Sequence, residues 1–450
     1  MRPRNPLSSR CARRVAAGFS RTAPLRCWTR WQIATAVAAG VCLATVLTRG
    51  QSPLTPSAMR NHPAIGYQTV PPTDEVARLA ERLRRGDTRL QFEPTTGYLR
   101  SVLEALHVPV ESQLLVFSKS SFQQAKIDPR NPRALYFNDT VSVGWVRGGT
   151  VLEFAAQDPR QGTMFYTLEQ TPSAAPAIRH DLSCVQCHTS DATLDVPGMF
   201  LGSSFTDTNG TVVYTPVFSV DHRTPFDLRW GGWYVTGRHS LPRHMGNSLM
   251  KPGGTADDQV NPADLLVESL EGRFDMAGYL SPHSDIVALM MLEHQAHLLN
   301  LLTRIGWRAR VGTAAGVSWQ DDVGELVDYL LFVDEEPLPG PLARSAFAKA
   351  FASRGPRDSR GRSLRDLDLE TRLMQYRCSF VIYSEPFDAL PAEVKRAVYA
   401  RMWEILSGRD RAARYEKLSA ADRQAIVEIL EETKPGLPNY FTSGQDSASP

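Results

Sequence analysis

Short apolar runs rich in β-branched and aromatic residues occupy the chain between Gln113 and about Thr236. Turn-forming pairs, among them Asp-Pro, Asn-Gly and Gly-Gly, separate these runs, which is typical of antiparallel strands joined by hairpins. The pattern predicts strands over residues 114–117, 134–137, 141–146, 151–156, 164–168, 199–205, 212–220 and 233–236.

A helical period of apolar positions flanks this region on both sides. Two short amphipathic helices are expected before it, over about Thr73–Arg85 and Thr96–His107. At least five helices are expected after it, over residues 284–306, 320–333, 342–353, 391–407 and 419–433. Strands followed by helices predict an α+β fold, in which a strand-rich region precedes an all-helical C-terminal region.

The first 50 residues contain nine arginines, no acidic residue and an apolar run from Trp31 to Leu47. Residues 1–30 are predicted to form a basic cytoplasmic head, and residues 31–48 a transmembrane helix that acts as an anchor or a signal. No clean small-residue cleavage motif follows the run, which favours an uncleaved anchor. Because arginines stay on the cytoplasmic side, the main domain is expected on the periplasmic side of the cell membrane after a single pass.

Composition and periodicity divide the rest of the chain. The expected parts are a linker (49–65), a strand-rich domain (66–240), a helical region (241–440) and a disordered tail (441–450). The most apolar later stretch, Ile286–Ile305, contains Glu293, Arg304 and several polar side chains, so no second membrane span is expected.

Charge excludes one class of partner. The whole chain has a formal charge of +2, but the residues after the arginine-rich start hold 41 basic against 48 acidic side chains. An acidic domain has no electrostatic means of holding a phosphate backbone, so nucleic-acid binding is not expected.

The segment Cys184–His188 reads C-x-x-C-H and carries the clearest chemistry. In c-type cytochromes two thiols with this spacing form thioethers with the porphyrin vinyl groups, and the adjacent histidine ligates the iron. The motif predicts one covalently attached haem c, held by Cys184 and Cys187, with His188 as the proximal iron ligand. Export of the domain agrees with this prediction, because c-type haem is attached outside the cytoplasm.

Three other interpretations of the motif remain open at this stage. A zinc site needs four ligands, and the chain has no second C-x-x-C, although His180 and His188 could complete a set within one loop. A dithiol redox pair usually opens a helix after a strand, which the preceding residues do not favour. A structural disulfide between Cys184 and Cys187 would close a strained loop.

The sequence does not decide which side chain, if any, is the sixth ligand of the iron. Met245 is the preferred distal candidate, because small cytochromes supply a methionine downstream of the motif. His239 and His244 lie in the same loop as Met245, and Met199 lies closer to the motif. His294 is a further candidate. It lies on the apolar face of the predicted helix 284–306, where a histidine is more often a hydrogen-bonded core residue than a ligand.

Two other side chains have simpler expected roles. His297 lies among polar positions of the same predicted helix and is expected to be solvated. Cys378 precedes an apolar run and is expected to be a buried structural thiol.

Several segments resemble an uncharacterised bacterial family of single-haem, cytochrome c domain-containing proteins. The resemblance rests on Asn131–Asp139, Arg229–Gly237, Asp285–Leu289 and Leu364–Arg372, and covers roughly Leu114 to Phe441. It implies haem binding and electron transfer, with Cys184, Cys187 and His188 as the only functional positions that carry over. Strands on both sides of the motif depart from the small all-helical cytochrome domain.

Three functions follow as hypotheses. The first is a membrane-anchored electron-transfer protein, not an enzyme, whose acidic surface docks a cationic redox partner. The second is a haem-based sensor or binding module with an open iron face. The third is a haem enzyme such as a peroxidase, although diheme peroxidases need a second C-x-x-C-H. Tight six-coordination of the iron would favour the first hypothesis over the other two.

Overall fold

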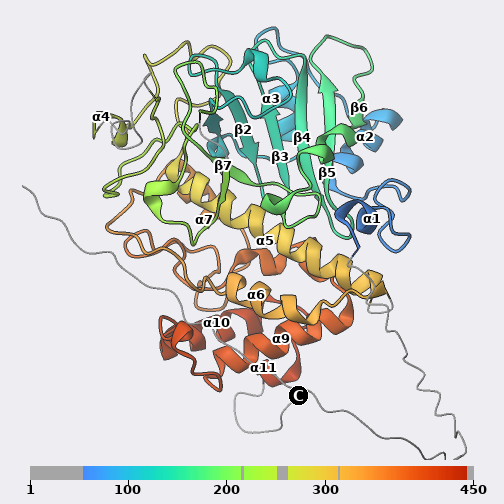
Figure 1. The fold of residues 1–450 in the computed structure, drawn as a ribbon, viewed down its shortest axis with the longest axis vertical. Helices are drawn as coiled ribbons and strands as arrows, with labels where there is room; N and C mark the ends of the chain where they lie inside the picture. Colours follow the sequence, from blue (N-terminus) through green and yellow to red (C-terminus); the bar gives the residue numbers. More distant parts are fainter. Residues whose placement is uncertain (1–53, 214–216, 251–261, 313–314, 443–450) are drawn as a thin grey trace, which may run out of the picture. The chain divides into compact units, whose positions relative to one another are not determined.

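The computed structural model describes residues 54–213, 217–250, 262–312 and 315–442, which belong to one compact unit (Figure 1). A strand-rich N-terminal half precedes a helical C-terminal region, which confirms the α+β prediction at this level. The head and membrane helix predicted over residues 1–30 and 31–48 lie outside the described residues. Among the described helices, none combines the length and the apolarity needed to cross a bilayer.

The core of the strand-rich half is a six-stranded antiparallel meander in which each strand pairs with the next. The strands are β1 (Leu114–Val116), β2 (Arg133–Phe137), β3 (Val141–Trp145), β4 (Val151–Asp158), β5 (Gly162–Glu169) and β6 (Ile178–His180). The first five confirm predicted strands. The sixth was not predicted, because it is short, polar and largely exposed.

The two strands β7 (Leu201–Ser203) and β8 (Phe218–Val220) form a separate antiparallel pair. Both are shorter than the predicted strands 199–205 and 212–220. The strand predicted over residues 233–236 is wrong. That segment lies beside β1 through isolated bonds, such as Tyr234 N–H to the Leu115 carbonyl at 2.9 Å, and the preceding Gly232 has a φ of +86° that breaks extended pairing.

Three helices precede the sheet: α1 (Pro56–Arg60), α2 (Glu75–Arg85) and α3 (Leu99–Ala105). The latter two confirm the amphipathic helices expected there. The first lies in the predicted linker, where Thr55 caps the helix and Pro56 occupies its first turn. The linker is therefore ordered over these residues, and Ile65 at its end is buried.

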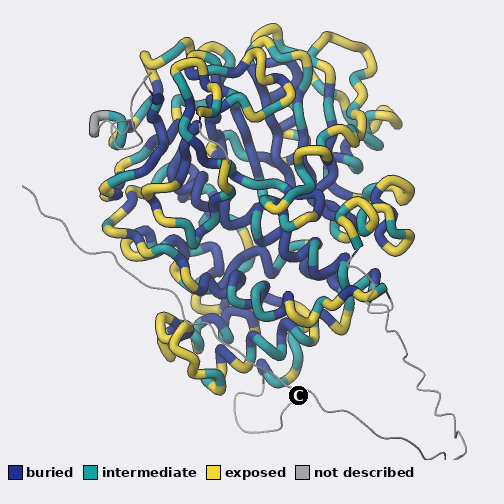
Figure 2. Tube along the Cα trace, in the orientation of Figure 1, coloured by how far each residue is buried: buried dark blue, intermediate teal, exposed yellow. Residues whose placement is uncertain are grey.

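The long helix α5 (Ile286–Val311) organises the molecule. Asp285 caps its first turn by accepting the Ala288 N–H at 2.9 Å. The helix lies between the sheet and the C-terminal helices, so nearly every residue along it is buried (Figures 1 and 2). A helix covered on all sides can be apolar around its whole circumference, which is why its sequence is so apolar without being a membrane span.

The remaining α-helices confirm the other four predicted helices and add three short ones. They are α4 (Pro262–Leu265), α6 (Gln320–Leu330), α7 (Ala346–Ala352), α8 (Glu385–Asp388), α9 (Ala392–Leu406), α10 (Ala420–Thr433) and α11 (Asn439–Thr442). The all-helical expectation is wrong in detail, because 266–285 and 353–379 contain no α-helix. The predicted tail at 441–450 begins with Phe441, which is fully buried, and residues 443–450 lie outside the described part of the chain.

Two hydrophobic clusters meet at α5. One joins its apolar residues to the C-terminal helices, and the other joins the sheet to α2, α3 and Trp307 near the end of α5. Met199, which leads into β7, packs against both clusters. The segment between the C-x-x-C-H motif and β7 is therefore anchored at the junction of the sheet and the helical region. Cys378 is fully buried in the first cluster, as the sequence predicts.

Candidate functional site

The C-x-x-C-H motif forms a compact turn directly after β6. Asp181 caps the 3₁₀ helix Leu182–Gln186 by accepting the Ser183 N–H. The N–H groups of Cys187 and His188 both bond to the carbonyl of Cys184, at 3.2 and 3.0 Å. The structure thus brings the two predicted thiols and the predicted proximal histidine into one turn.

The two thiols differ in exposure and are not joined in a disulfide. Cys187 is exposed and Cys184 is half-buried. Burial, with smaller contributions from Asp181 and Glu153, raises the pKa of Cys184 to about 11. A protonated thiol of this kind is a poor nucleophile for disulfide exchange, which weighs against the dithiol interpretation.

His188 is held as a neutral imidazole with a defined tautomer. Burial lowers its pKa, and Nδ1 donates to the Gly198 carbonyl at 2.9 Å. The Gly198 N–H returns a bond to the His188 carbonyl at 3.0 Å. Because a carbonyl can only accept, the proton resides on Nδ1 and the lone pair on Nε2, which has no hydrogen-bond partner within the described residues.

Aromatic rings enclose the imidazole of His188 on two sides. The ring of Phe165 in β5 lies 4.8 Å away and that of Phe200 lies 6.1 Å away, measured between centroids. A neutral histidine with Nδ1 bonded to a carbonyl and Nε2 unpartnered has the arrangement expected of a metal-ligating histidine. The residues of the turn therefore fit a haem held by two thioethers and one imidazole.

Met245, the preferred distal candidate, is engaged elsewhere. Its sulfur accepts from the Ser203 hydroxyl at 3.7 Å, and its N–H bonds to the Arg229 carbonyl. The side chain is buried, with its methyl group close to Gly231. No hydrogen bond or ring contact of the described residues joins Met245 to His188, so its role as a distal ligand stays a prediction.

The other candidate ligands also have partners of their own. His239 and His244 both donate to the Leu265 carbonyl, at 2.9 and 3.3 Å. Burial lowers the pKa of His244 to about 4. Met199 lies beside Gly198, and its carbonyl is bound by Asn300 of α5.

His294 is a hydrogen-bonded core residue in a network that the sequence did not reveal. Its Nδ1 meets Nδ1 of His222 at 2.8 Å, and its Nε2 meets the Ser379 hydroxyl at 2.8 Å. Both imidazoles are buried and stack against Tyr329 and Phe332. With both nitrogens occupied, His294 is not free to ligate iron in this arrangement.

A second polar cluster lies on the neighbouring face of α5. Glu293 forms a buried ion pair with Arg229 and accepts from Trp230 Nε1 at 3.2 Å. Burial raises the pKa of Glu293, and the guanidinium of Arg229 opposes this shift. The sequence analysis did not predict this pair, because the two residues lie 64 positions apart in the chain.

The expectation that His297 is solvated is wrong. Its side chain is only 14% exposed and lies 3.9 Å from the carboxylate of Asp221. Arg223 reaches its Nε2 at 3.3 Å, and its ring packs on Tyr329. The polar side of α5 around His297 is not open to solvent, because β8 and the loop after it cover that side.

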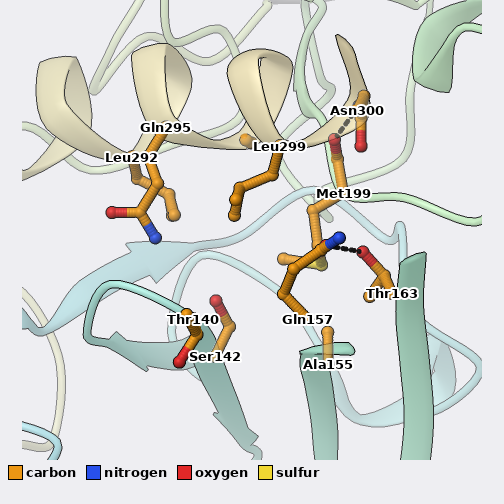
Figure 3. A pocket seen from close by; sticks show the side chains of 11 residues that line it. Thr140, Ser142, Ala155, Gln157, Thr163, Met199, Leu292, Gln295, Leu299 and Asn300 are labelled. Atoms are coloured by element: carbon orange, nitrogen blue, oxygen red, sulfur yellow. Dashed lines mark hydrogen bonds between the residues drawn. The ribbon is translucent and has the colours of Figure 1, made fainter. Parts of the chain in front are cut away.

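A cavity of about 20 Å³ lies between the sheet and α5 (Figure 3). Polar side chains of β4, β5 and α5 and the side chain of Met199 line it. This volume accommodates a water molecule and not a macrocycle. Cys184, Cys187 and His188 are not among the residues that line the cavity.

A zinc site finds no support in the described residues, since no group of three or more His, Cys, Asp or Glu side chains there is placed to hold a metal ion. No protein-family model, curated protein or solved structure matches the chain. The resemblance to the single-haem family therefore stays a prediction.

Proposed function

We propose that this chain is a membrane-anchored, extracytoplasmic c-type haem protein that transfers electrons. The observation that carries the proposal is the geometry of one turn. Both thiols of the motif lie in it beside His188, whose Nδ1–H is bound by Gly198 and whose Nε2 is unpartnered. This combination is what covalent haem attachment and axial ligation require.

The chain's residues would each have a defined role at this site. Cys184 and Cys187 would fix the macrocycle, and His188 would offer Nε2 to the iron. Gly198 holds the imidazole proton at Nδ1, which keeps the lone pair on the ligating nitrogen and raises its basicity. Bound haem would supply a one-electron iron couple close to the surface, where an acidic domain favours a cationic partner.

A haem-based sensor is the second candidate function. The observation that favours it is the engagement of Met245, His239 and His294 in hydrogen bonds away from His188. If none of them reaches the iron, one face stays open for a small ligand. Carbon monoxide binding to the reduced protein separates the two functions: a six-coordinate iron that excludes the gas supports electron transfer, and rapid binding supports the sensor.

Haem staining of a denaturing gel tests the proposal. The full-length chain is expressed with a c-haem maturation system, beside a Cys184→Ala/Cys187→Ala variant and a Cys378→Ala control. We expect the wild type and the control to keep their haem after denaturation and the double variant to lose it. A folded wild-type chain without stain would overturn the proposal.

A further inference from the structure

The segment Pro197–Met199 is held by three different parts of the molecule through three consecutive carbonyls. The first carbonyl accepts from the Thr163 N–H of β5 at 3.1 Å. The second accepts from Nδ1 of His188 at 2.9 Å. The third accepts from Nδ2 of Asn300 in α5 at 2.8 Å (Figure 3). The carbonyl that orients the histidine is therefore fixed by the sheet on one side and by α5 on the other.

Asn300 approaches this segment unusually closely. Its side chain is 1% exposed, and its Oδ1 lies 2.1 Å from the position that a Cβ on Gly198 would take. Only a glycine allows such an approach of side chain to backbone. The carboxamide therefore both binds the Met199 carbonyl and packs against Gly198, which leaves the Gly198 carbonyl little freedom to move.

We infer that Asn300 is a positioning residue that sets the hydrogen bond between Gly198 and His188. The inference rests on the proposed function of His188 as the haem ligand. A firm bond from Nδ1–H to a carbonyl makes the imidazole more basic, and a more basic ligand stabilises ferric iron over ferrous iron. Loss of the Asn300 contact would loosen the carbonyl, weaken the bond and shift the reduction potential to more positive values.

The test compares Asn300→Leu with Thr303→Val in the full-length, haem-loaded protein. Thr303 lies nearly one turn further along α5 and accepts from Gln157 of β4 at 3.0 Å. Among the described residues, no hydrogen bond joins Thr303 directly to Pro197, Gly198 or Met199. Both variants keep the branching of the side chain. Asn300→Leu removes a hydrogen bond from α5 to the loop, and Thr303→Val removes one between α5 and the sheet. Asn300→Ala serves in place of Asn300→Leu if the latter does not fold.

We expect the reduction potential to move to more positive values in the Asn300 variant and to stay at the wild-type value in Thr303→Val. Equal potentials in all three proteins, with similar losses of stability in both variants, would overturn the inference and leave Asn300 a packing residue.

A second readout separates this inference from the proposed function. In chains labelled with ¹⁵N-histidine, the Nδ1 proton of His188 is observable with or without haem. We expect it to exchange slowly in the wild type and about tenfold faster in the Asn300 variant, because a looser carbonyl opens more often. If the wild type binds no haem but this difference persists, the haem proposal fails and the positioning role stands. Unchanged exchange would contradict the positioning role in either case.

Discussion

His222 and His294 share one hydrogen bond between their Nδ1 atoms, so one ring must donate and the other accept. Burial is the main reason that the pKa values of both lie well below the usual value, and each would repel a charge on the other. The pair is therefore expected to remain neutral in the folded protein. Its stacking on Tyr329 and Phe332 places it between the two helices α5 and α6.

This neutrality predicts a pH dependence with a definite sign. Unfolded histidines take up protons below about pH 6.5, whereas the folded pair does not. Its contribution to stability is therefore complete above about pH 6.5 and is lost as the pH falls, by up to about 1.4 kcal/mol per pH unit for each ring. Burial raises the pKa of Asp74 to about 6, which acts in the opposite sense, so bulk unfolding curves mix the two effects.

Titration of the ring nitrogens by ¹⁵N NMR isolates the histidine contribution. We expect His222 and His294 to show neutral shifts from pH 7.5 to 5 for as long as the protein is folded. Protonation of either ring near pH 6.5 in the folded protein would show that the pair is not held neutral.

At the scale of elements, the period of apolar residues predicted the strands and helices that local sequence determines. Strands β1 to β5 and the long helices appear where apolar runs of the matching period occur. The segment 233–236 has the composition of a strand, but its pairing depends on distant β1 and on the turn at Gly232. Likewise the motif singled out Cys184, Cys187 and His188, whereas the carbonyl that orients His188 comes from Gly198. The neighbouring Met199 is held by Asn300 of α5, and no local pattern encodes this contact.

Two glycine substitutions are expected to change the free energy of unfolding in opposite directions. Gly198→Ala would place its Cβ 2.1 Å from the Asn300 carboxamide, and we expect a loss of about 1–3 kcal/mol from overpacking. Gly324 lies inside α6, and a Cβ there would meet nothing within 4 Å. Gly324→Ala should therefore stabilise the protein by about 0.5–1 kcal/mol, because alanine restricts the unfolded chain and favours helix.

Denaturant unfolding of both variants measures the two changes. Partial recovery of stability in Gly198→Ala/Asn300→Ala would confirm that the clash is local. A Gly198→Ala protein as stable as the wild type would contradict the close approach.

In the whole molecule, an arginine-rich start with an apolar run precedes a domain that has more acidic than basic side chains. The described residues contain no membrane-spanning helix, so the membrane attachment proposed here depends on residues 31–48. That attachment would keep the haem turn close to membrane-bound redox partners.

Fractionation of cells tests this attachment. We expect the full-length chain to stay in the membrane pellet through an alkaline carbonate wash and to be degraded by protease added outside the cytoplasmic membrane. A chain in which a cleavable leader replaces residues 1–50 should be released as a soluble protein. Full-length chain in the soluble fraction would contradict an uncleaved anchor.

The most direct test of the central claim is the intact mass of the denatured full-length protein, purified after expression with the c-haem maturation system. Covalent attachment predicts the mass of the chain plus one haem, and the mass of the chain alone in Cys184→Ala/Cys187→Ala. A folded wild-type protein with the mass of the chain alone would contradict the account.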